Sequence, residues 1–208
     1  MTTATATRPV TPVGTVNWPH LFRKQVTKND DGTEKSRYEI TLIFSPEAQQ
    51  KASYKAMEKA IQTAAEEKWG RIPKGAKLPL KKCEDAKTYC EDDEHGNKGE
   101  GPVQERFKGC TFAVFSSQNK VGVFDNAGGY IEEESEIYRG CVGAAMYHTY
   151  CYDIKGKAMG VNFGIDAFRK FAEGTPLGGG GKAVDADEAA AAFAGVDFDA
   201  DPDDDEII

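Results

Sequence analysis

The sequence has no run of apolar residues long enough for a membrane-spanning helix, which needs about 20. It has only three histidines, His20, His95 and His148, in three separate contexts. There is also no nucleophile elbow, no glycine-rich phosphate loop and no HExxH motif. These absences argue against helical membrane proteins, α/β-hydrolases, P-loop proteins and zinc proteases. We expect a protein without enzymatic activity and without a cofactor.

Cysteine is scarce and irregularly spaced. The five cysteines are an odd number without a tight pair, which favours a reducing compartment over a disulfide framework. The first residues do not combine a charged segment with an apolar stretch, so no secretory signal is expected. A soluble protein of the cytoplasm fits both observations.

Zinc binding is one alternative for the cysteines. Cys83, Cys90, His95 and Cys110 supply four potential ligands, but their spacing lacks the close pairs that structural zinc sites use. Free thiols in the core are the preferred interpretation, and the zinc alternative stays open at this point.

Charge is distributed unevenly along the chain. The formal net charge is −8, yet the last 26 residues hold ten of the 34 acidic side chains and none of the 26 basic ones. Residues 1–182 therefore carry a net charge of +2, next to a separate anionic tail. Such an asymmetry is typical of an interaction tail, although a purely solubilising end has the same composition.

Composition divides the chain into four parts. Residues 1–12 are mainly Thr, Ala and Pro, which predicts a disordered arm. Residues 13–177 carry the hydrophobic patterns of a folded domain. Residues 178–182 form a glycine-rich linker, and residues 183–208 form an acidic tail that we expect to be disordered.

The folded part is predicted to be mainly β. A turn at residues 29–32 separates two strand-like runs, and residues 37–44 alternate between apolar and polar side chains. Ser45 and Pro46 then predict the start of one capped helix, which Gly70 ends. Residues 71–108 have no clear period and are expected to form a long loop. Further strands are predicted at 110–116, 121–124, 139–152 and 158–165, followed by a short helix at 166–172.

About five or six strands, one helix after the second strand and long connections indicate a small, partly open β-barrel of the OB-fold type. A β-sandwich would produce similar signals, so the pattern alone leaves that alternative.

Aromatic and basic residues gather at the end of the predicted strand 139–152. Tyr147, Tyr150 and Tyr152 lie there, and Lys155 and Lys157 follow in the next turn. Binding unpaired bases needs an aromatic face for each base and a cation for each phosphate. The alternative is that the tyrosines fill the core and the lysines are ordinary surface residues. With the basic body and acidic tail, we interpret the group as a nucleic-acid-binding surface.

Other residues are assigned to this surface by their chemistry. Candidate phosphate contacts are Lys120, Arg37, Lys81 and Lys82, and Arg106 and Lys108 would extend the groove. Trp18 and Phe22 are further stacking candidates, although either residue fits a core equally well.

Four short motifs resemble the phage single-stranded DNA-binding proteins. They are WPHLF at 18–22, KLPLK at 77–81, YRGC at 138–141 and GVNFGI at 160–165. The resemblance extends over residues 13–181 and is most specific in the second half. It implies an OB-fold, sequence-independent binding of single-stranded DNA, and a role in phage DNA replication and recombination in the host cytoplasm.

The tail also resembles the tails with which replication single-strand binders recruit polymerases and helicases. The resemblance implies that its end (Asp203, Asp204, Asp205, Glu206, Ile207 and Ile208) binds such partners. Many of these tails end in an aromatic residue, whereas this one ends in two isoleucines, and Phe193 and Phe198 lie further inside. As a polyanion, the tail is also expected to compete with DNA for the basic groove.

Two other functions remain open. One is an OB-type scaffold that recruits partners without binding nucleic acid, and the other is a metal-dependent nucleic-acid enzyme. The oligomeric state stays undetermined, a homo-oligomer included, and no membrane partner is expected.

Overall fold

The computed structural model describes residues 8–28, 32, 34–154 and 158–177. The chain divides into two compact units, Met1–Leu177 and Gly178–Ile208. Only the first contains described residues, so the predicted linker and acidic tail lie outside the description. Within the described residues no helix is long and apolar enough to cross a membrane.

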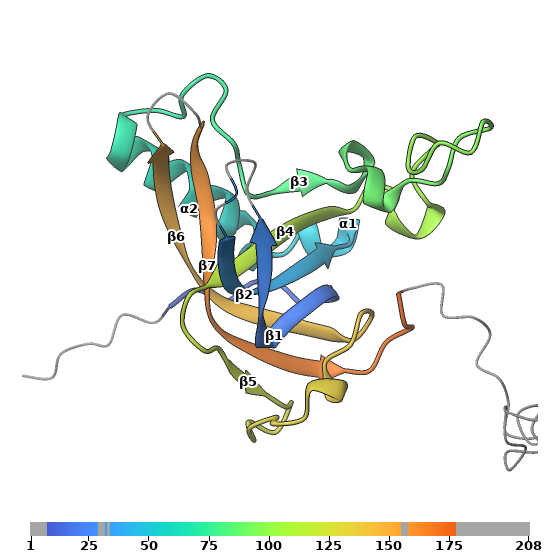
Figure 1. The fold of residues 1–208 in the computed structure, drawn as a ribbon. Helices are drawn as coiled ribbons and strands as arrows, with labels where there is room; N and C mark the ends of the chain where they lie inside the picture. Colours follow the sequence, from blue (N-terminus) through green and yellow to red (C-terminus); the bar gives the residue numbers. More distant parts are fainter. Residues whose placement is uncertain (1–7, 29–31, 33, 155–157, 178–208) are drawn as a thin grey trace, which may run out of the picture. The chain divides into compact units, whose positions relative to one another are not determined.

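Five strands form a barrel (Figure 1). They are β1 (Gly14–Lys28), β2 (Glu34–Phe44), β4 (Thr111–Ser117), β6 (Val142–Ile154) and β7 (Ala158–Ala172). Neighbours follow the order β4-β2-β1-β6-β7, and a parallel pairing of β4 with β7 closes the ring. This is the five-stranded, partly open barrel of the OB-fold, and it confirms the predicted fold class.

Two short strands and four 3-10 turns complete the described part of the domain. β3 (Lys81–Lys82) pairs with β4, and β5 (Gly122–Phe124) pairs with β7 in parallel. The turns are η1 (Cys83–Asp85), η2 (Lys87–Tyr89), η3 (Glu105–Phe107) and η4 (Glu134–Glu136). The first three lie in the predicted long loop, which runs outside the barrel (Figure 1).

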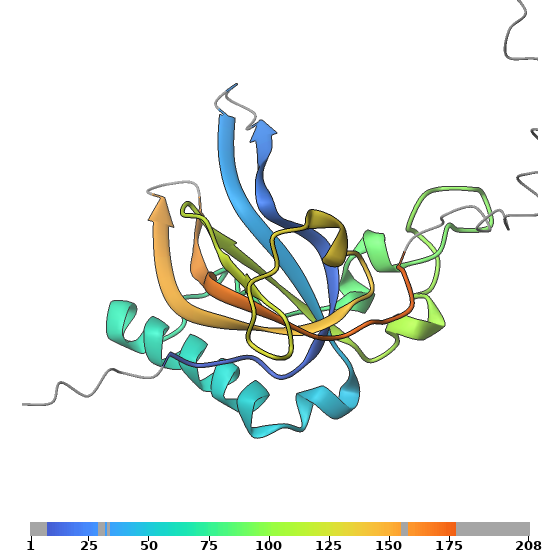
Figure 2. The same ribbon diagram turned by 90° about the horizontal axis from the view of Figure 1, so that it is seen from below.

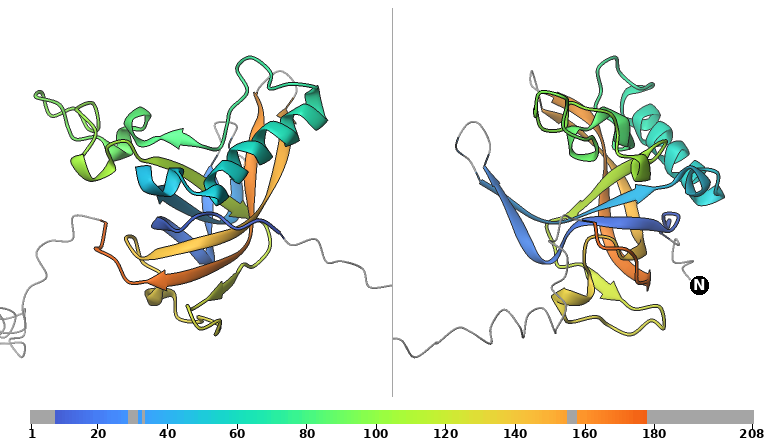
Figure 3. Two further views of the ribbon diagram at one scale, coloured as in Figure 1. Left: turned by 180° about the vertical axis from the view of Figure 1, so that it is seen from behind. Right: turned by 90° about the vertical axis from the view of Figure 1, so that its right-hand side faces the viewer.

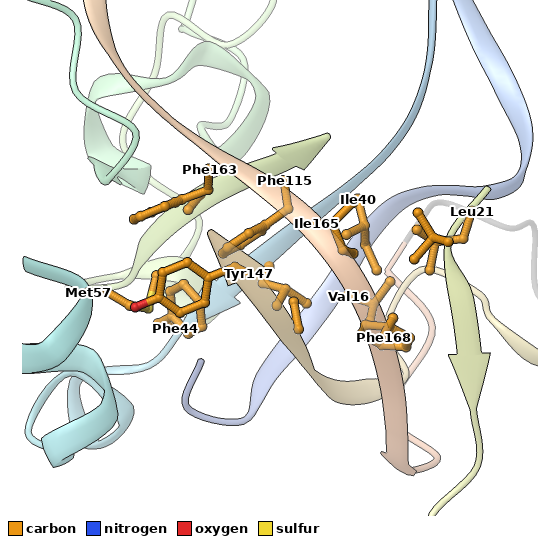
Figure 4. Packing of buried hydrophobic residues seen from close by; sticks show 14 of the residues in the cluster. Val16, Leu21, Ile40, Phe44, Met57, Phe115, Tyr147, Phe163, Ile165 and Phe168 are labelled. Carbon is orange, nitrogen blue, oxygen red and sulfur yellow. The ribbon is translucent and has the colours of Figure 1, made fainter. Parts of the chain in front are cut away.

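The barrel interior is built from alternating side chains. In β2, Ile40, Leu42 and Phe44 are fully buried, as the alternation predicts. Figure 4 shows Val16 of β1, Phe115 of β4 and Tyr147 of β6 packed in the same interior. Most of the turn predicted at 29–32 lies outside the described residues, but the strands that flank it are antiparallel, and Lys28 pairs with Glu34. Beyond the barrel these strands continue as an exposed two-stranded ribbon (Figure 3).

The helix predicted over residues 45–69 is two helices, α1 (Pro46–Gln49) and α2 (Ala52–Trp69). Ser45 Oγ accepts from Ala48 N at the start, and Gly70 ends α2 in the left-handed conformation, as expected. Between them the backbone becomes extended at Lys51. The Gln49 amide donates to the Phe44 and Gly109 carbonyls, which anchors α1 beside the barrel before α2 starts. α2 then packs against β6 and β7 on one side of the barrel (Figure 2).

The short helix predicted at 166–172 is wrong, because these residues continue β7. Phe168 pairs with Ala145 of β6 and with Val123 of β5, so the backbone of this segment has strand partners on both sides. Phe168 and Lys170 are buried while Arg169 and Phe171 point outward, which is the period of a strand rather than a helix.

Part of the arm predicted to be disordered packs on the barrel. Tyr147 N donates to the Pro9 carbonyl (3.0 Å), and Thr11 N donates to the Ala145 carbonyl (2.9 Å). Residues 8–12 thus add backbone hydrogen bonds along β6, a tertiary contact that composition does not reveal.

The four potential zinc ligands do not converge. Cys83 and Cys110 are buried in a second core between β4 and the long loop, and burial raises the pKa of Cys83 to about 12. Cys90 Sγ instead donates to the Glu84 and Ala86 carbonyls. Across the described ranges, no three His, Cys, Asp or Glu side chains are grouped to hold a metal.

Candidate nucleic-acid interface

Two hollows lie on the outer face of the barrel around β2 and β4. The Trp18 hollow is formed by β1, β2, β4 and the segment around η2, and is lined by Trp18, Gln25, Glu39, Thr41, Ala86, Thr88, Tyr89, Phe112 and Val114. The Tyr150 hollow lies between β2, β4 and β6, and is lined by Arg37, Ser116, Ser117, Gln118, Asn119, His148 and Tyr150.

An ion pair joins the two hollows. Arg37 Nε lies 2.6 Å from Glu39 Oε2, and Arg37 lines one hollow while Glu39 lines the other. Glu39 also stands opposite Ser116 of β4 in the sheet. The hollows therefore form one continuous surface across β2 and β4, with a guanidinium at its centre.

Trp18 is held in place by its neighbours. Its φ of 42° is unusual for a residue other than glycine, and such strain persists only where the surroundings enforce it. The Arg139 guanidinium lies 4.8 Å from the Trp18 ring centroid, and Arg139 Nε donates to Asn17 Oδ1 (2.8 Å). The Tyr89 ring lies 6.3 Å from the Trp18 ring. These contacts fix a half-buried indole at the wall of its hollow.

A glycine allows His148 to pack against the sheet beside the Tyr150 hollow. Gly164 of β7 pairs with both Ser116 and His148, and a Cβ there would lie 2.2 Å from the His148 ring. His148 Nδ1 is 2.9 Å from Asp166 Oδ1, and its ring is 6.0 Å from the ring of Tyr150. Tyr150 is 37% exposed.

Tyr147 is a core residue, not a stacking residue. Its side chain is 0% exposed and packs against Phe115 and Phe163 inside the barrel, and burial raises its pKa to about 12. Strand residues alternate, so His148, Tyr150 and Tyr152 share the outward face and Tyr147 lies on the other. Because side chains alternate between the two faces of a strand, the sequence positions alone place Tyr147 on one face and Tyr150 and Tyr152 on the other.

The remaining predicted residues lie in several places. Tyr152 is half-buried, two residues beyond Tyr150. Lys81 and Lys82 are exposed at the edge of the sheet, where Lys81 pairs with Phe112 of the Trp18 hollow. Phe22 and Lys120 come together in a third hollow next to β5.

Two of the cations that were expected to extend the groove have partners of their own. Arg106 lies over the Phe107 ring, and Lys108 is 3.5 Å from Glu105. Lys155, Lys157 and the tail residues 203–208 lie outside the described residues.

The sequence did not point to Tyr89 or Arg139 as groove residues. Tyr89 lies in the long loop, where no periodicity indicates which side chains turn inward, and Arg139 lies 122 residues from its partner Asn17. YRGC at 138–141, one of the resemblance motifs, was the one available signal for Arg139.

Aromatic surfaces, hydroxyl groups and a guanidinium thus share one open face. Aromatic rings can stack on unpaired bases of any sequence, and cations beside them can bind the phosphates between those bases. The Arg37–Glu39 pair keeps the centre of the face near neutral until an anion competes for the guanidinium.

One known protein family matches most of the chain. The model of a protein family described as "Enterobacter phage Enc34, ssDNA-binding protein" matches residues 10–205. No curated protein matches the chain.

Solved structures of the Enc34 protein show the same fold. The single-stranded DNA-binding protein from bacteriophage Enc34 in complex with ssDNA has a TM-score of 0.61 and 16% identity, over 81% of this chain and 88% of that one. A second structure of the Enc34 single-stranded DNA-binding protein has the same TM-score and identity, over 86% of this chain and 88% of that one. The single-stranded DNA-binding protein gp2.5 of bacteriophage T7 has a TM-score of 0.46 and 16% identity, over 92% and 95%.

Proposed function

Since the chain belongs to the family of the Enterobacter phage Enc34 ssDNA-binding protein, we propose that it binds single-stranded DNA along the Trp18 and Tyr150 hollows. The observation that carries this proposal is the continuous outer surface of β2 and β4, with aromatic side chains at both ends and Arg37 between them. OB-folds bind oligonucleotides on the corresponding face.

Bases would stack on Trp18 and Tyr150, while the phosphates between them bind Arg37. Lys81 and Lys82 would add positive charge beside the Trp18 hollow, and Lys155 and Lys157 would do so after β6. Because every base has an aromatic face, binding would depend little on sequence, and because phosphate contacts release counterions, it would weaken steeply with salt. Coating single strands in this way serves phage DNA replication and recombination.

The acidic tail would have two roles, recruitment of replication proteins and competition with DNA. The end of the folded domain supports the second role. Leu177, the last described residue, packs in the second core with Tyr89 and Phe112, and both of these also line the Trp18 hollow. A short glycine tether from that point gives the carboxylates an effective concentration on the order of millimolar at the groove.

Tryptophan fluorescence tests the proposed surface, because the chain has only two tryptophans. Adding oligo-dT is expected to quench the wild-type protein at low salt, without cleavage in Mg²⁺. Trp18→Phe should abolish most of the quenching, and Trp69→Phe, at the end of α2, should preserve it.

The opposite pattern, with quenching lost in Trp69→Phe and kept in Trp18→Phe, would place the DNA elsewhere. Absence of any binding at low salt would favour the protein-recruiting scaffold, and cleavage would favour the enzyme.

A further inference from the structure

A third hollow lies beside β5, outside the surface described so far. It is lined mainly by Phe22 of β1, by the residues that enter β5 and by those that follow the next turn, including Lys120, Val121, Tyr130 and Glu132. We call it the Tyr130 hollow. Val121, Val123 and Ile131 are part of the main core, so its floor belongs to the rigid body of the barrel.

Tyr130 is the most exposed of the large hydrophobic side chains in the described part of the chain, at 74%. Its ring lies 4.6 Å from the Phe124 ring at an angle of 39°, which supports it from one side. An aromatic ring displayed in this way contributes little to the core, since most of its surface stays in water. Its position calls for another explanation.

The turn that carries Tyr130 is firmly fixed. Asp125 N donates to the Gly129 carbonyl (2.8 Å), and Gly129 N donates to Asp125 Oδ1 (2.7 Å). Ile131 N donates to the Val123 carbonyl (2.9 Å), and Arg169 Nε of β7 donates to the Asp125 carbonyl (3.1 Å). The ring is therefore displayed on an ordered backbone, which lowers the entropy cost of binding a ligand there.

The hollow adjoins the proposed DNA surface. Gln118 and Asn119 line the Tyr150 hollow, and the next residues, Lys120 and Val121, line the Tyr130 hollow. Lys120 is exposed and forms no ion pair with any residue that the structure describes. A strand that leaves the Tyr150 hollow past Asn119 therefore meets a free ammonium group and then an aromatic ring.

The chemistry of the lining selects a base rather than a phosphate for the hollow itself. Phe22 and Tyr130 offer aromatic surface, whereas the Glu132 carboxylate would repel a phosphate. Lys120, at the border between the Tyr150 and Tyr130 hollows, supplies a cation for the phosphate backbone of the DNA.

We infer that the Tyr130 hollow binds a nucleobase of the DNA strand beyond the Tyr150 hollow, with Tyr130 stacking on the base and Lys120 binding its phosphate. The inference rests on the proposed function, because it extends the same strand. It makes β5 and its turn part of the binding footprint.

The test is a series of oligo-dT lengths from about 4 to about 16 nucleotides, the range of site sizes seen for OB-folds. Tyr130→Ala should weaken binding of long oligonucleotides about tenfold, the effect of losing one stacked base, and leave short ones unchanged. Tyr130→Phe should bind as wild type. Phe171→Ala, an exposed aromatic on the outer face of β7, is the matched control and should have no effect at any length.

A direct readout complements the affinities. Tyr130→Trp in a Trp18→Phe background should be quenched by long oligonucleotides and not by short ones. If Tyr130→Ala binds every length as wild type does, or if the loss is equal at all lengths, the inference is overturned. If wild-type protein binds none of the oligonucleotides, the proposed function itself fails.

Discussion

At the scale of single residues, the direction of a side chain decides its role. Tyr147 and Tyr150 lie three positions apart on β6, yet one fills the barrel and the other lines an open hollow. The Tyr147 hydroxyl has no hydrogen-bond partner among the described residues although it is buried. An unpaired buried hydroxyl costs about 1–3 kcal/mol, so this tyrosine serves the core with its ring alone.

The two tyrosines therefore give opposite expectations. Tyr150→Ala should lower oligo-dT affinity by about 1–3 kcal/mol, the value of one stacked base, with little change in stability. Tyr147→Phe should leave affinity unchanged and raise the free energy of unfolding by about 1 kcal/mol, because the unpaired hydroxyl is removed. DNA titration and urea denaturation of both variants measure these changes.

Unchanged affinity in Tyr150→Ala would remove this residue from the interface. A less stable Tyr147→Phe would mean that the hydroxyl is satisfied in solution.

At the scale of elements, the sequence predicted what depends on local signals. The alternation in β2, the Ser45 cap and the Gly70 stop are encoded within a few residues, and the structure has all three. The prediction from sequence was wrong where distant partners determine the secondary structure. Residues 166–172 form a strand because β5 and β6 pair with them. The Trp18 hollow was likewise unpredictable, since Tyr89 and Arg139 reach it from separate loops.

One element-level feature, the glycine of β7 under His148, can be tested directly. Gly164→Ala should push the imidazole away from the sheet, because the new methyl group would lie 2.2 Å from the ring. The His148–Asp166 hydrogen bond would then break and the Tyr150 hollow would change shape, lowering DNA affinity severalfold. Since His148 is exposed and the ring is the far end of its side chain, stability should change little.

A double-mutant cycle with His148→Ala checks the mechanism. The two changes should be strongly non-additive in affinity, because without the imidazole the methyl group displaces nothing. Additive losses would show that Gly164→Ala lowers DNA affinity without displacing the His148 imidazole.

At the scale of the whole molecule, charge separates a slightly basic body from an acidic end. Truncation after Lys182 changes the net charge from −8 to +2. We expect the truncated protein to bind oligo-dT more tightly at low salt, because a tethered competitor is removed. The gain should fade as the Debye length falls below about 8 Å.

Affinity of both proteins across a salt series measures the effect. A full-length variant with Ile207→Ala and Ile208→Ala is the control: it keeps every charge, so it should compete as wild type does while losing partner recruitment. Equal affinities of full-length and truncated protein at low salt would contradict competition by the tail.

The closure of the barrel has a consequence for what DNA does to the protein. β4 and β7 are joined through only two residue pairs, and one of them, Ser116 with Gly164, lies at the Tyr150 hollow between the strands that line it. A nucleic acid lying in that hollow would contact Ser116 of β4 on one side of Gly164 and His148 of β6 on the other. The bound ligand would then hold these strands together, and amide hydrogen exchange along the β4–β7 junction should slow when it binds. The bound strand would thus reinforce the closure of the barrel.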